Sequence, residues 1–423
     1  MDASVKPTRC SNSRVWKGKL FSTAELVALH DEYGTHHYKS YPVVMCRGRG
    51  VRLQDSDGIW YSDLNATYSA IAAGHANPEL RRTIYRQTGR LTSISNIFQN
   101  EHAPVLEQKL CSLTGQQKVL FMNSGAEAFD TTVKAVRKWA YRVKCVPTGK
   151  AKIIVARGNF HGRTLCAISA SSERKYREGF GPFVPGFVKI PFGDIAALER
   201  AITPETAAFI IEPIQGEGGI NIPPPGYLQA VRKLCTQRNV LLVFDEVQTG
   251  LGRTGKLFAY EHWGVKPDLI MLGKALGQYI PISAVLGKAE LMELFSPGSH
   301  GSTFGGNPLA CATALTSIEL ITRDDCALVR NSADVGEYMR EQLSEALRKN
   351  PNVLEVRGEG LLIGIALDPK RVSADEVRTN LLRHRVVAGS TSKSSNVLRL
   401  SPALIYGRKH VDVDVRRIAQ ACG

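Results

Sequence analysis

Short apolar runs recur through the middle of the chain, and helical patterns separate them. From about Val119 onward the runs are VLFMN, AKIIVA, FVKIPF, AAFIIEP, VLLVFDE, DLIMLGK and ISAVLG. Strands that are buried on both faces read as continuous apolar runs, and strands that alternate with helices form parallel sheets. The pattern predicts an α/β fold with a mostly parallel seven-stranded sheet that carries helices on both faces.

The first part of the chain has a different, strand-rich pattern. Residues 23–32 form a predicted helix capped by Ser22 or Thr23. Strands are expected around residues 51–53 and 59–62, with Asp57-Gly58 as the turn between them. A further helix is expected to begin near Pro78.

The last part of the chain mixes helices and strands. Helices are expected over residues 308–320, 333–349 and 374–384, and strands in VLEVRGEGLLIGIAL and VLRLSPAL. The patterns divide the chain into residues 1–20 as a flexible N-terminal arm, 21–70 as the N-terminal part of a small α+β domain, 71–306 as a large domain, and 307–423 as the C-terminal part of the small domain.

Two of the apolar runs end on charged residues. Residues 240–244 lead into Asp245 and Glu246, and residues 269–272 lead into Gly273 and Lys274. The spacing matches a βαβ unit, which takes roughly 30 residues. Ligands of open parallel sheets bind beyond the carboxyl ends of the strands. We therefore expect the Asp245 carboxylate and the Lys274 amine to face one ligand.

An amine and a carboxylate that face one ligand are the protein groups of pyridoxal 5'-phosphate (PLP) chemistry. The lysine forms a Schiff base, and the carboxylate keeps the ring nitrogen protonated. Two unit charges ~4 Å apart attract by roughly 4 kcal/mol at an effective dielectric constant of about 20, before desolvation is subtracted. The alternative is that Asp245 caps a helix and Lys274 lies on the surface.

Two further motifs follow predicted strands. Ser124, Gly125 and Ala126 lead into a helix, where a hydroxyl and backbone amides can hold a phosphate. In GNFHGRT, Phe160 could cover a flat ring and Arg163 could bind a carboxylate through two hydrogen bonds. The alternatives are an ordinary strand-to-helix turn at Ser124, and a packed Phe160 beside a solvated Arg163.

Composition narrows the class of protein. The 423 residues, 43% of them hydrophobic, leave room for two domains, and no apolar run approaches the roughly 18 residues of a membrane span. The net charge of +15 raises the question of nucleic acid, but Lys and Arg are spread along the chain without a binding motif. Small anionic ligands need only local positive charge. We expect no nucleic acid, no membrane and no metal.

Cysteine usage and the first residues bear on the compartment. The nine cysteines are scattered without a C-x-x-C spacing, which favours free thiols in a reducing compartment. The first 20 residues carry five Lys or Arg against one acid, which is faintly typical of a transit peptide. The expected location is cytoplasmic, with the mitochondrial matrix as the alternative.

Taken together, the motifs resemble those of the class III, fold-type I PLP-dependent aminotransferases. The resemblance covers residues 33–403 and rests on NSGAEA, GNFHGRT, EPIQGEGG, FDEVQTGLGRTG, PDLIMLGKA and HGSTFGGNP. It implies the PLP-transferase fold type I, with residues 71–306 as the PLP-binding domain. By this resemblance the cofactor-binding residues are Ser124, Gly125, Ala126, Phe160, His161, Glu212, Asp245, Gln248, Lys274, Ser302 and Thr303.

The resemblance also implies a role for several of these residues. Lys274 is the catalytic Schiff-base lysine and Asp245 the catalytic partner of the pyridine nitrogen, while Gln248 bonds the ring hydroxyl and Phe160 stacks on the ring. The phosphate is held by Ser124, Gly125 and Ala126, with Ser302 and Thr303 of the neighbouring subunit. A site completed across an interface implies a homodimer or a dimer of dimers.

Within this class, the ornithine aminotransferases are the most similar group. Their substrate-binding tyrosines and their paired acid and arginine correspond to Tyr38, Tyr68, Glu217 and Arg399. Acetylornithine and 4-aminobutyrate aminotransferases share the PLP motifs but usually lack a tyrosine at the place of Tyr68. The alternative for both tyrosines is half-buried packing.

The implied reaction moves the δ-amino group of L-ornithine to 2-oxoglutarate, giving L-glutamate 5-semialdehyde and L-glutamate by ping-pong turnover. Arg163 and Tyr38 are candidates for the α-carboxylate, and a partly exposed, reversible ion pair from Glu217 is expected to mask Arg399. The alternatives are an acetylornithine or other ω-amino acid aminotransferase and, in a different class, a non-catalytic basic binding protein.

The chain departs from the family pattern at two places. The segment ALGQYIPISAV after Lys274 is one residue shorter than the usual glycine-rich loop, and Phe304 replaces a common tyrosine. Both departures concern the loop beside the lysine and the subunit contacts rather than the identity of the lysine.

Overall fold

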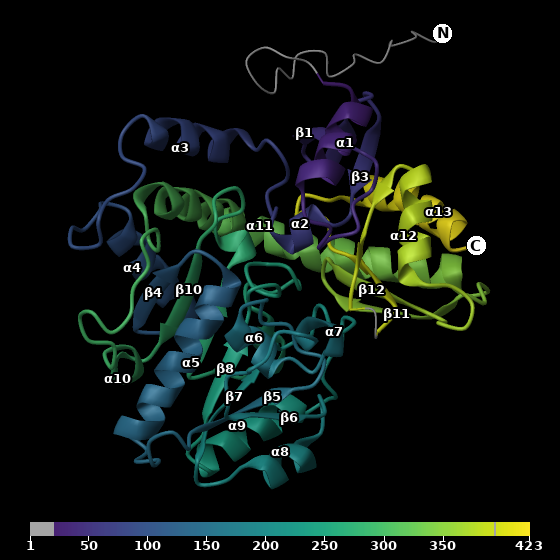
Figure 1. The fold of residues 1–423 in the computed structure, drawn as a ribbon. Coiled ribbons are helices and arrows are strands. Elements are labelled where there is room, and N and C mark those ends of the chain that lie inside the picture. Colours follow the sequence, from purple (N-terminus) through teal and green to yellow (C-terminus); the bar gives the residue numbers. More distant parts are fainter. Residues whose placement is uncertain (1–20, 393–394) are drawn as a thin grey trace, which may run out of the picture.

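The computed structural model describes residues 21–392 and 395–423, so the expected arm at residues 1–20 lies outside the described residues. A large sheet with helices packed around it forms one region (Figure 1). In a second region the N-terminal elements lie beside the C-terminal ones. The long helix α11 (Pro308–Leu347) extends from one region to the other and contacts both α3 and α13.

The large sheet has seven strands in the order β4-β10-β9-β8-β7-β5-β6. Their bounds are β4 (Lys118–Met122), β5 (Lys152–Ala156), β6 (Phe187–Ile190), β7 (Thr206–Ile211), β8 (Leu241–Asp245), β9 (Leu269–Leu272) and β10 (Ser283–Gly287). Strands β9, β8, β7, β5 and β6 pair in parallel, whereas β10 is antiparallel to both neighbours. The prediction of a mostly parallel seven-stranded sheet is confirmed.

Alternate residues of one strand enter two separate cores. On β8, Leu242 and Phe244 join a core with α9 (Tyr227–Gln237), while Leu241 and Val243 join another with α5 (Gly125–Arg142). Helices therefore cover both faces, which is why the central strands are apolar at nearly every position. The other helices of this region are α6 (Leu165–Ala170), α7 (Arg174–Arg177), α8 (Ile195–Ala201), α10 (Ala289–Met292) and the 3-10 helix η1 (Ala259–Trp263).

The N-terminal segment contributes three of the four strands of a small sheet. Helix α1 (Thr23–Tyr33) starts from a capping box formed by Ser22 and Glu25, and β2 (Arg52–Asp55) and β3 (Trp60–Asp63) form the predicted antiparallel pair. The order is β1-β2-β3-β13, so distant segments of the sequence share this sheet. The remaining elements are β1 (Met45–Arg49), β13 (Val386–Val387), α2 (Ala66–Ser69), α3 (Pro78–Thr88) and α4 (Ala103–Thr114).

The C-terminal segment contains the predicted helices and strands with one shift. Helix α11 spans both helices expected after residue 307, and its backbone leaves helical geometry at residues 323–326. The second half therefore begins before residue 333. A third sheet has the order β11-β12-β15-β14. The bounds are β11 (Val353–Glu359), β12 (Leu362–Leu367), β14 (Gly389–Ser390), β15 (Val397–Leu400), α12 (Ala374–Arg383) and α13 (Arg408–Cys422).

The cysteines depart from expectation at one position. Cys46 is disulfide-bonded, which corrects the prediction of free thiols, because sequence spacing alone does not show which thiols meet in the fold. The free thiols among the described residues are Cys111, Cys145, Cys166, Cys235, Cys311, Cys326 and Cys422. Across residues 21–392 and 395–423, no helix has the length and apolar character to cross a membrane.

Candidate active site

Asp245 and Lys274 lie at the carboxyl ends of two neighbouring parallel strands, as predicted. Asp245 is the last residue of β8 and stands opposite Met271 of β9. Lys274 begins the 3-10 turn η2 (Lys274–Leu276) just beyond β9. Both line one cavity of about 170 Å³, called here the Lys274 cavity. Its lining residues are Gly125, Ala126, Phe160, His161, Gly162, Glu212, Asp245, Val247, Gln248, Thr249 and Lys274.

The surroundings of the Lys274 amine favour its neutral form. Burial lowers the pKa of Lys274 to about 8; the negative charge of Glu217 opposes this shift and the positive charge of Arg399 adds to it. A neutral amine is the nucleophilic form of lysine. Near pH 8 about half of this amine is therefore ready to attack a carbonyl carbon.

A buried histidine holds the Asp245 carboxylate. Nδ1 of His161 donates a hydrogen bond of 2.6 Å to Oδ2 of Asp245, and the Val247 amide donates one of 3.0 Å to Oδ1. The ring of Phe129 stacks on His161 with 4.7 Å between centroids. Burial lowers the pKa of His161, but Asp245 and Glu212 outweigh burial and raise it above the ordinary value. The two hydrogen bonds fix the orientation of the Asp245 carboxylate at the end of β8.

Glu212 fixes the backbone on which the cavity aromatic stands. One carboxylate oxygen accepts a hydrogen bond from the Phe160 amide and the other from the Gly216 amide, each at 3.1 Å. Burial raises the pKa of Glu212 to about 7, and these two amides act in the opposite direction. Glu212 therefore belongs to the site through the position it gives Phe160, and burial leaves it ready to carry a proton near neutral pH.

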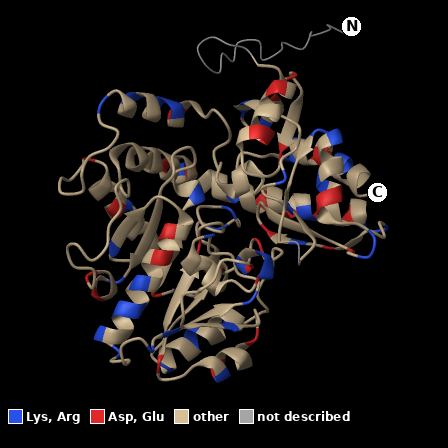
Figure 2. Cartoon of the chain, in the orientation of Figure 1, with Lys and Arg blue, Asp and Glu red and all other residues tan. Residues whose placement is uncertain are grey.

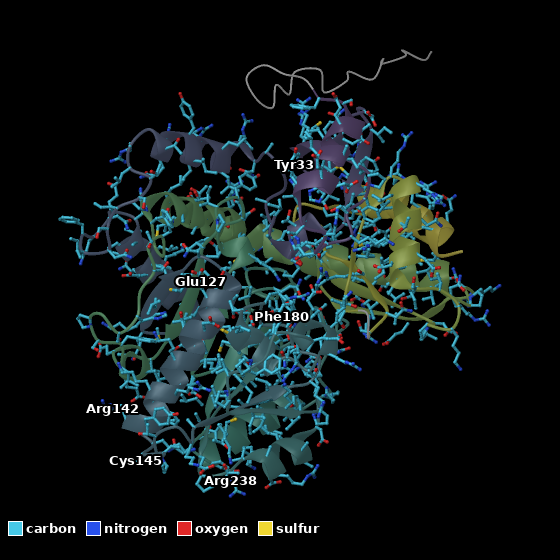
Figure 3. The ribbon with its side chains drawn as sticks, viewed as in Figure 1. Tyr33, Glu127, Arg142, Cys145, Phe180 and Arg238 are labelled. Carbon is cyan, nitrogen blue, oxygen red and sulfur yellow. The ribbon has the colours of Figure 1, made fainter. Side chains whose placement is uncertain are left out.

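The start of α5 forms one wall of the cavity. Ser124 caps the helix: its hydroxyl donates to Glu127 at 3.1 Å and accepts from the Glu127 amide at 3.2 Å. A Cβ at Gly125 would lie 2.9 Å from Val247 Cγ1, so a side chain there would close the gap. The first turn of α5 can hold an anion. The Ser124 hydroxyl, however, is engaged with Glu127, which lies at one end of α5 with Arg142 at the other (Figure 3).

Ser302 and Thr303 do not line the Lys274 cavity of their own chain. The Ser302 hydroxyl accepts a hydrogen bond of 2.9 Å from Asn123 Nδ2, just before the start of α5. Thr303 is exposed, as is Phe304. This loop therefore lies next to the start of α5, which forms one wall of the cavity, but does not line the cavity itself.

A second group of polar residues includes Glu217 and Arg399, whose charges act on Lys274 from outside the residues that line the cavity. Tyr38 and Tyr68 are 62% and 45% exposed. The Arg399 guanidinium lies 5.5 Å from the centre of the Tyr68 ring and forms an ion pair with Glu217. Gln248 Nε2 donates a long hydrogen bond of 3.4 Å to the Tyr68 carbonyl. Tyr68 has φ of 57°, a strained value for a bulky residue, so the fold imposes its position.

Sequence reasoning missed the partner of Arg163. The guanidinium of Arg163 lies 3.5 Å from the centre of the Tyr176 ring, and Tyr176 meets Phe160 edge-on with 6.0 Å between centroids. No family motif contains Tyr176, so only the fold brings it to Arg163. Phe129, which stacks on His161, was missed for a different reason: its helical position in SGAEAF indicates core packing and no more.

The shortened loop after Lys274 packs against the start of α3 within the same chain. Gln278 Oε1 accepts a hydrogen bond of 2.7 Å from the Ala73 amide, and Gln278 Nε2 donates one of 2.8 Å to Ser317. The Tyr279 hydroxyl accepts one of 2.7 Å from the Asn77 amide. The departure from the family pattern is therefore accommodated without a free loop beside the lysine.

Comparison with known proteins agrees with this geometry. The sequence profile of the class-III aminotransferases matches residues 33–422. Ornithine aminotransferase 2 of Staphylococcus aureus strain Mu50 is 44% identical over 94% of this chain and 99% of its own length. The crystal structure of ornithine aminotransferase from Toxoplasma gondii ME49 superposes with a TM-score of 0.92 at 38% identity, over 96% of each chain.

A crystal structure of acetylornithine aminotransferase from Elizabethkingia anophelis is also similar, with a TM-score of 0.85 and 39% identity over 95% of this chain and 99% of that one. A lysine and an aspartate at adjacent strand ends, one cavity between them and a profile match over nearly the whole chain lead to one conclusion. The chain belongs to the class-III aminotransferases, which are PLP-dependent transaminases.

Proposed function

We propose that this chain is an ornithine δ-aminotransferase that transfers the δ-amino group of L-ornithine to 2-oxoglutarate and so forms L-glutamate 5-semialdehyde and L-glutamate by ping-pong turnover. The observation that carries the proposal is one site in which the Lys274 amine lies within the influence of both Asp245 and the Glu217–Arg399 pair. The S. aureus and T. gondii relatives, both ornithine aminotransferases, support it.

The residues of the Lys274 cavity fit PLP. The cavity offers an amine, a carboxylate and an aromatic ring, and the buried Nε2 of His161 has no hydrogen-bond partner within the described residues. A Cβ at Gly162 would lie 2.6 Å from that of Ala126, so the glycine keeps the helix start open. Class-III aminotransferases use PLP, which supplies an electron sink for the proton shift at the substrate carbon.

In this proposal the residues of the site divide between cofactor chemistry and cofactor binding. Lys274 would hold the cofactor, and its amine would move the proton at the substrate carbon as a general base, for which a pKa of about 8 is suitable. The Asp245 carboxylate would bind the ring nitrogen of the cofactor, and His161 orients Asp245. The residues that position the ring and phosphate are Phe160, Glu212, Gln248, Ser124, Gly125 and Ala126, with Ser302 and Thr303 of a second copy of the chain.

The charged and aromatic residues around the Lys274 cavity determine how the substrate is oriented. Ornithine has an amine at each end, so its α-carboxylate must bind away from Lys274, and Arg163 with Tyr38 are the groups we assign to it. Tyr176 holds the Arg163 side chain by a cation–π contact. Glu217 neutralises Arg399, which would otherwise bind the α-carboxylate too close to Lys274.

The proposal extends to assembly and location. A phosphate site completed by Ser302 and Thr303 of a second copy requires at least a homodimer, and we place the enzyme in the cytoplasm. The acetylornithine alternative is supported by the E. anophelis structure. Tyr68 argues against it, because a polar contact near Arg399 suits a free α-amino acid end better than an acylated amine.

An absorbance titration tests the proposal. Purified holoenzyme should show a visible band that bleaches with ornithine and recovers with 2-oxoglutarate, and N-acetylornithine should leave it in place. Lys274→Ala should abolish turnover, while Lys266→Ala, at an exposed position outside the cavity, should not. Equal bleaching by both amines would reject ornithine specificity, and turnover by Lys274→Ala would reject the assigned lysine.

A further inference from the structure

A second cavity lies at the edge of the large sheet, apart from the Lys274 cavity. It has a volume of about 430 Å³ and shares no lining residue with the Lys274 cavity. Arg157 follows the end of β5, and Lys189 lies on β6, the edge strand. The remaining lining residues come from α7 and its flanks: Ser171, Ser172, Arg174, Arg177, Glu178 and Phe183. We call it the α7 pocket.

The α7 pocket is strongly basic. Four of its lining residues are cationic, namely Arg157, Arg174, Arg177 and Lys189, and one is acidic. That acid, Glu178, lies 3.7 Å from Arg174 in an exposed ion pair, which is worth only ~0–1 kcal/mol. The other three cations therefore face the pocket with little compensation from its own lining. In Figure 2, α7 is drawn largely in the blue of Lys and Arg.

Two of the four cations, Arg177 and Lys189, are partly buried, whereas Arg157 and Arg174 are exposed. Arg177 Nη1 donates hydrogen bonds to the carbonyls of Ser169 at 2.9 Å and Ser171 at 3.1 Å, and its guanidinium lies 4.1 Å from the centre of the Phe183 ring. Lys189 is half-buried. The contacts of Arg177 fix the direction of its guanidinium group, so less rotamer entropy is lost at this residue when a ligand binds.

The pKa of Lys189 reflects the positive charges close to it. Burial lowers its pKa to about 8, and the positive charges of Arg177 and Arg157 add to the shift. Like charges gathered around one open pocket repel each other, and an anion between them relieves the repulsion. Guanidinium groups with fixed orientation also match the oxygen atoms of phosphate and carboxylate groups.

We propose that the α7 pocket is a binding site for a small polyanion, a molecule with two or more phosphate or carboxylate groups. The volume lies in the range of small-molecule sites, which take roughly 300–1,000 Å³. The carboxyl ends of parallel strands are where ligands of open sheets bind, and the pocket lies at the ends of β5 and β6. The inference does not depend on ornithine as the substrate.

The site borders the wall of the active site. Tyr176, on α7 between Arg174 and Arg177, lies against Arg163 of the substrate side. One short helix thus carries pocket residues and the aromatic partner of Arg163. A ligand in the α7 pocket would therefore contact the same helix that contacts Arg163. It would not enter the Lys274 cavity.

Equilibrium titration of the holoenzyme with pyrophosphate and, separately, with citrate tests the site. Wild-type protein should bind at least one of the two, and the double variant Arg157→Gln/Lys189→Met should bind it about tenfold more weakly or worse, because charge-assisted contacts are lost. The matched control is Arg142→Gln/Lys266→Met, which removes the same charge at exposed positions outside the pocket. Binding of pyrophosphate alone assigns a phosphoryl ligand, and binding of citrate alone a polycarboxylate.

A second measurement uses wild-type protein and so does not depend on how the variants fold. The bound anion should slow acylation of Lys189 by an amine-selective reagent, followed by mass spectrometry, and should leave Lys266 unaffected. The proposal is overturned if neither anion binds to wild-type enzyme, if both double variants lose affinity equally, or if Lys189 is not protected.

Discussion

Arg399 and Glu217 form an ion pair whose two sides differ in burial. The Arg399 side chain is completely buried on β15, whereas that of Glu217 is 19% exposed. The expectation of a partly exposed pair therefore holds for the acid only. Nε and Nη2 of Arg399 have no hydrogen-bond partner within the described residues. Removal of Glu217 would leave a buried charge unpaired, which a substrate carboxylate can then neutralise.

We predict that Glu217→Ala keeps or improves the glutamate half-reaction and lowers the δ-regiospecificity with ornithine. Without its partner, Arg399 binds the carboxylate of either amino acid near Lys274, which suits glutamate but presents the wrong amine of ornithine. Single-turnover absorbance with each substrate, together with identification of the keto acid or pyrroline product, measures both effects. Glu293→Ala, at an exposed acid that pairs with Lys118, is the control. Unchanged regiospecificity and unchanged glutamate reactivity would mean that the pair forms no gate.

Asp245→Asn should bind PLP but lose at least about a hundredfold in kcat, since the charge that stabilises the protonated ring nitrogen is gone. The shape is preserved, so His161 can still meet an oxygen at this place. Glu246→Gln is a matched control, because Glu246 is the adjacent buried acid and does not line the Lys274 cavity. Steady-state kcat and cofactor content decide: a wild-type kcat in the Asn variant contradicts the assigned role.

The rate at which apoenzyme takes up PLP should rise with pH and level off near pH 8. The neutral amine attacks the aldehyde, and burial holds the pKa of Lys274 at about 8 instead of 10.5. Below this pKa the neutral fraction grows about tenfold per pH unit. Stopped-flow absorbance between about pH 6 and about pH 10 gives the profile. A rate that keeps rising to about pH 10 would show an ordinary lysine.

Tyr68→Ile should shift the ratio of kcat/KM for ornithine over 4-aminobutyrate by about tenfold or more toward 4-aminobutyrate. The change removes a hydroxyl beside Arg399 and leaves an apolar wall, which favours a substrate without an α-amino acid end. Tyr33→Ile, at the exposed end of α1, is the control and should leave the ratio unchanged. An unaltered ratio in the Tyr68 variant would mean that this tyrosine only packs.

The sequence by itself determined the sheet and the placement of Asp245 and Lys274. The pattern is clearest in β7, β8, β9 and β10, which have every residue buried, because a strand buried on both faces has few polar positions to obscure its apolar run. A charge directly after such a run lies at the strand end by geometry alone. This placement depends only on residues that are adjacent in the sequence, so tertiary packing does not alter it.

Other features were decided only by the tertiary structure, because they depend on residues that meet across long separations. Tyr176 reaches Arg163 through the path of α7, the burial of Arg399 arises from the packing of β15, and the bond from His161 to Asp245 joins two different strand ends. The α7 pocket gathers Arg157 and Lys189 from neighbouring strands, so its charge density is invisible in a chain whose basic residues are evenly spread. Periodicity records which face of an element is buried, but not which other element covers it.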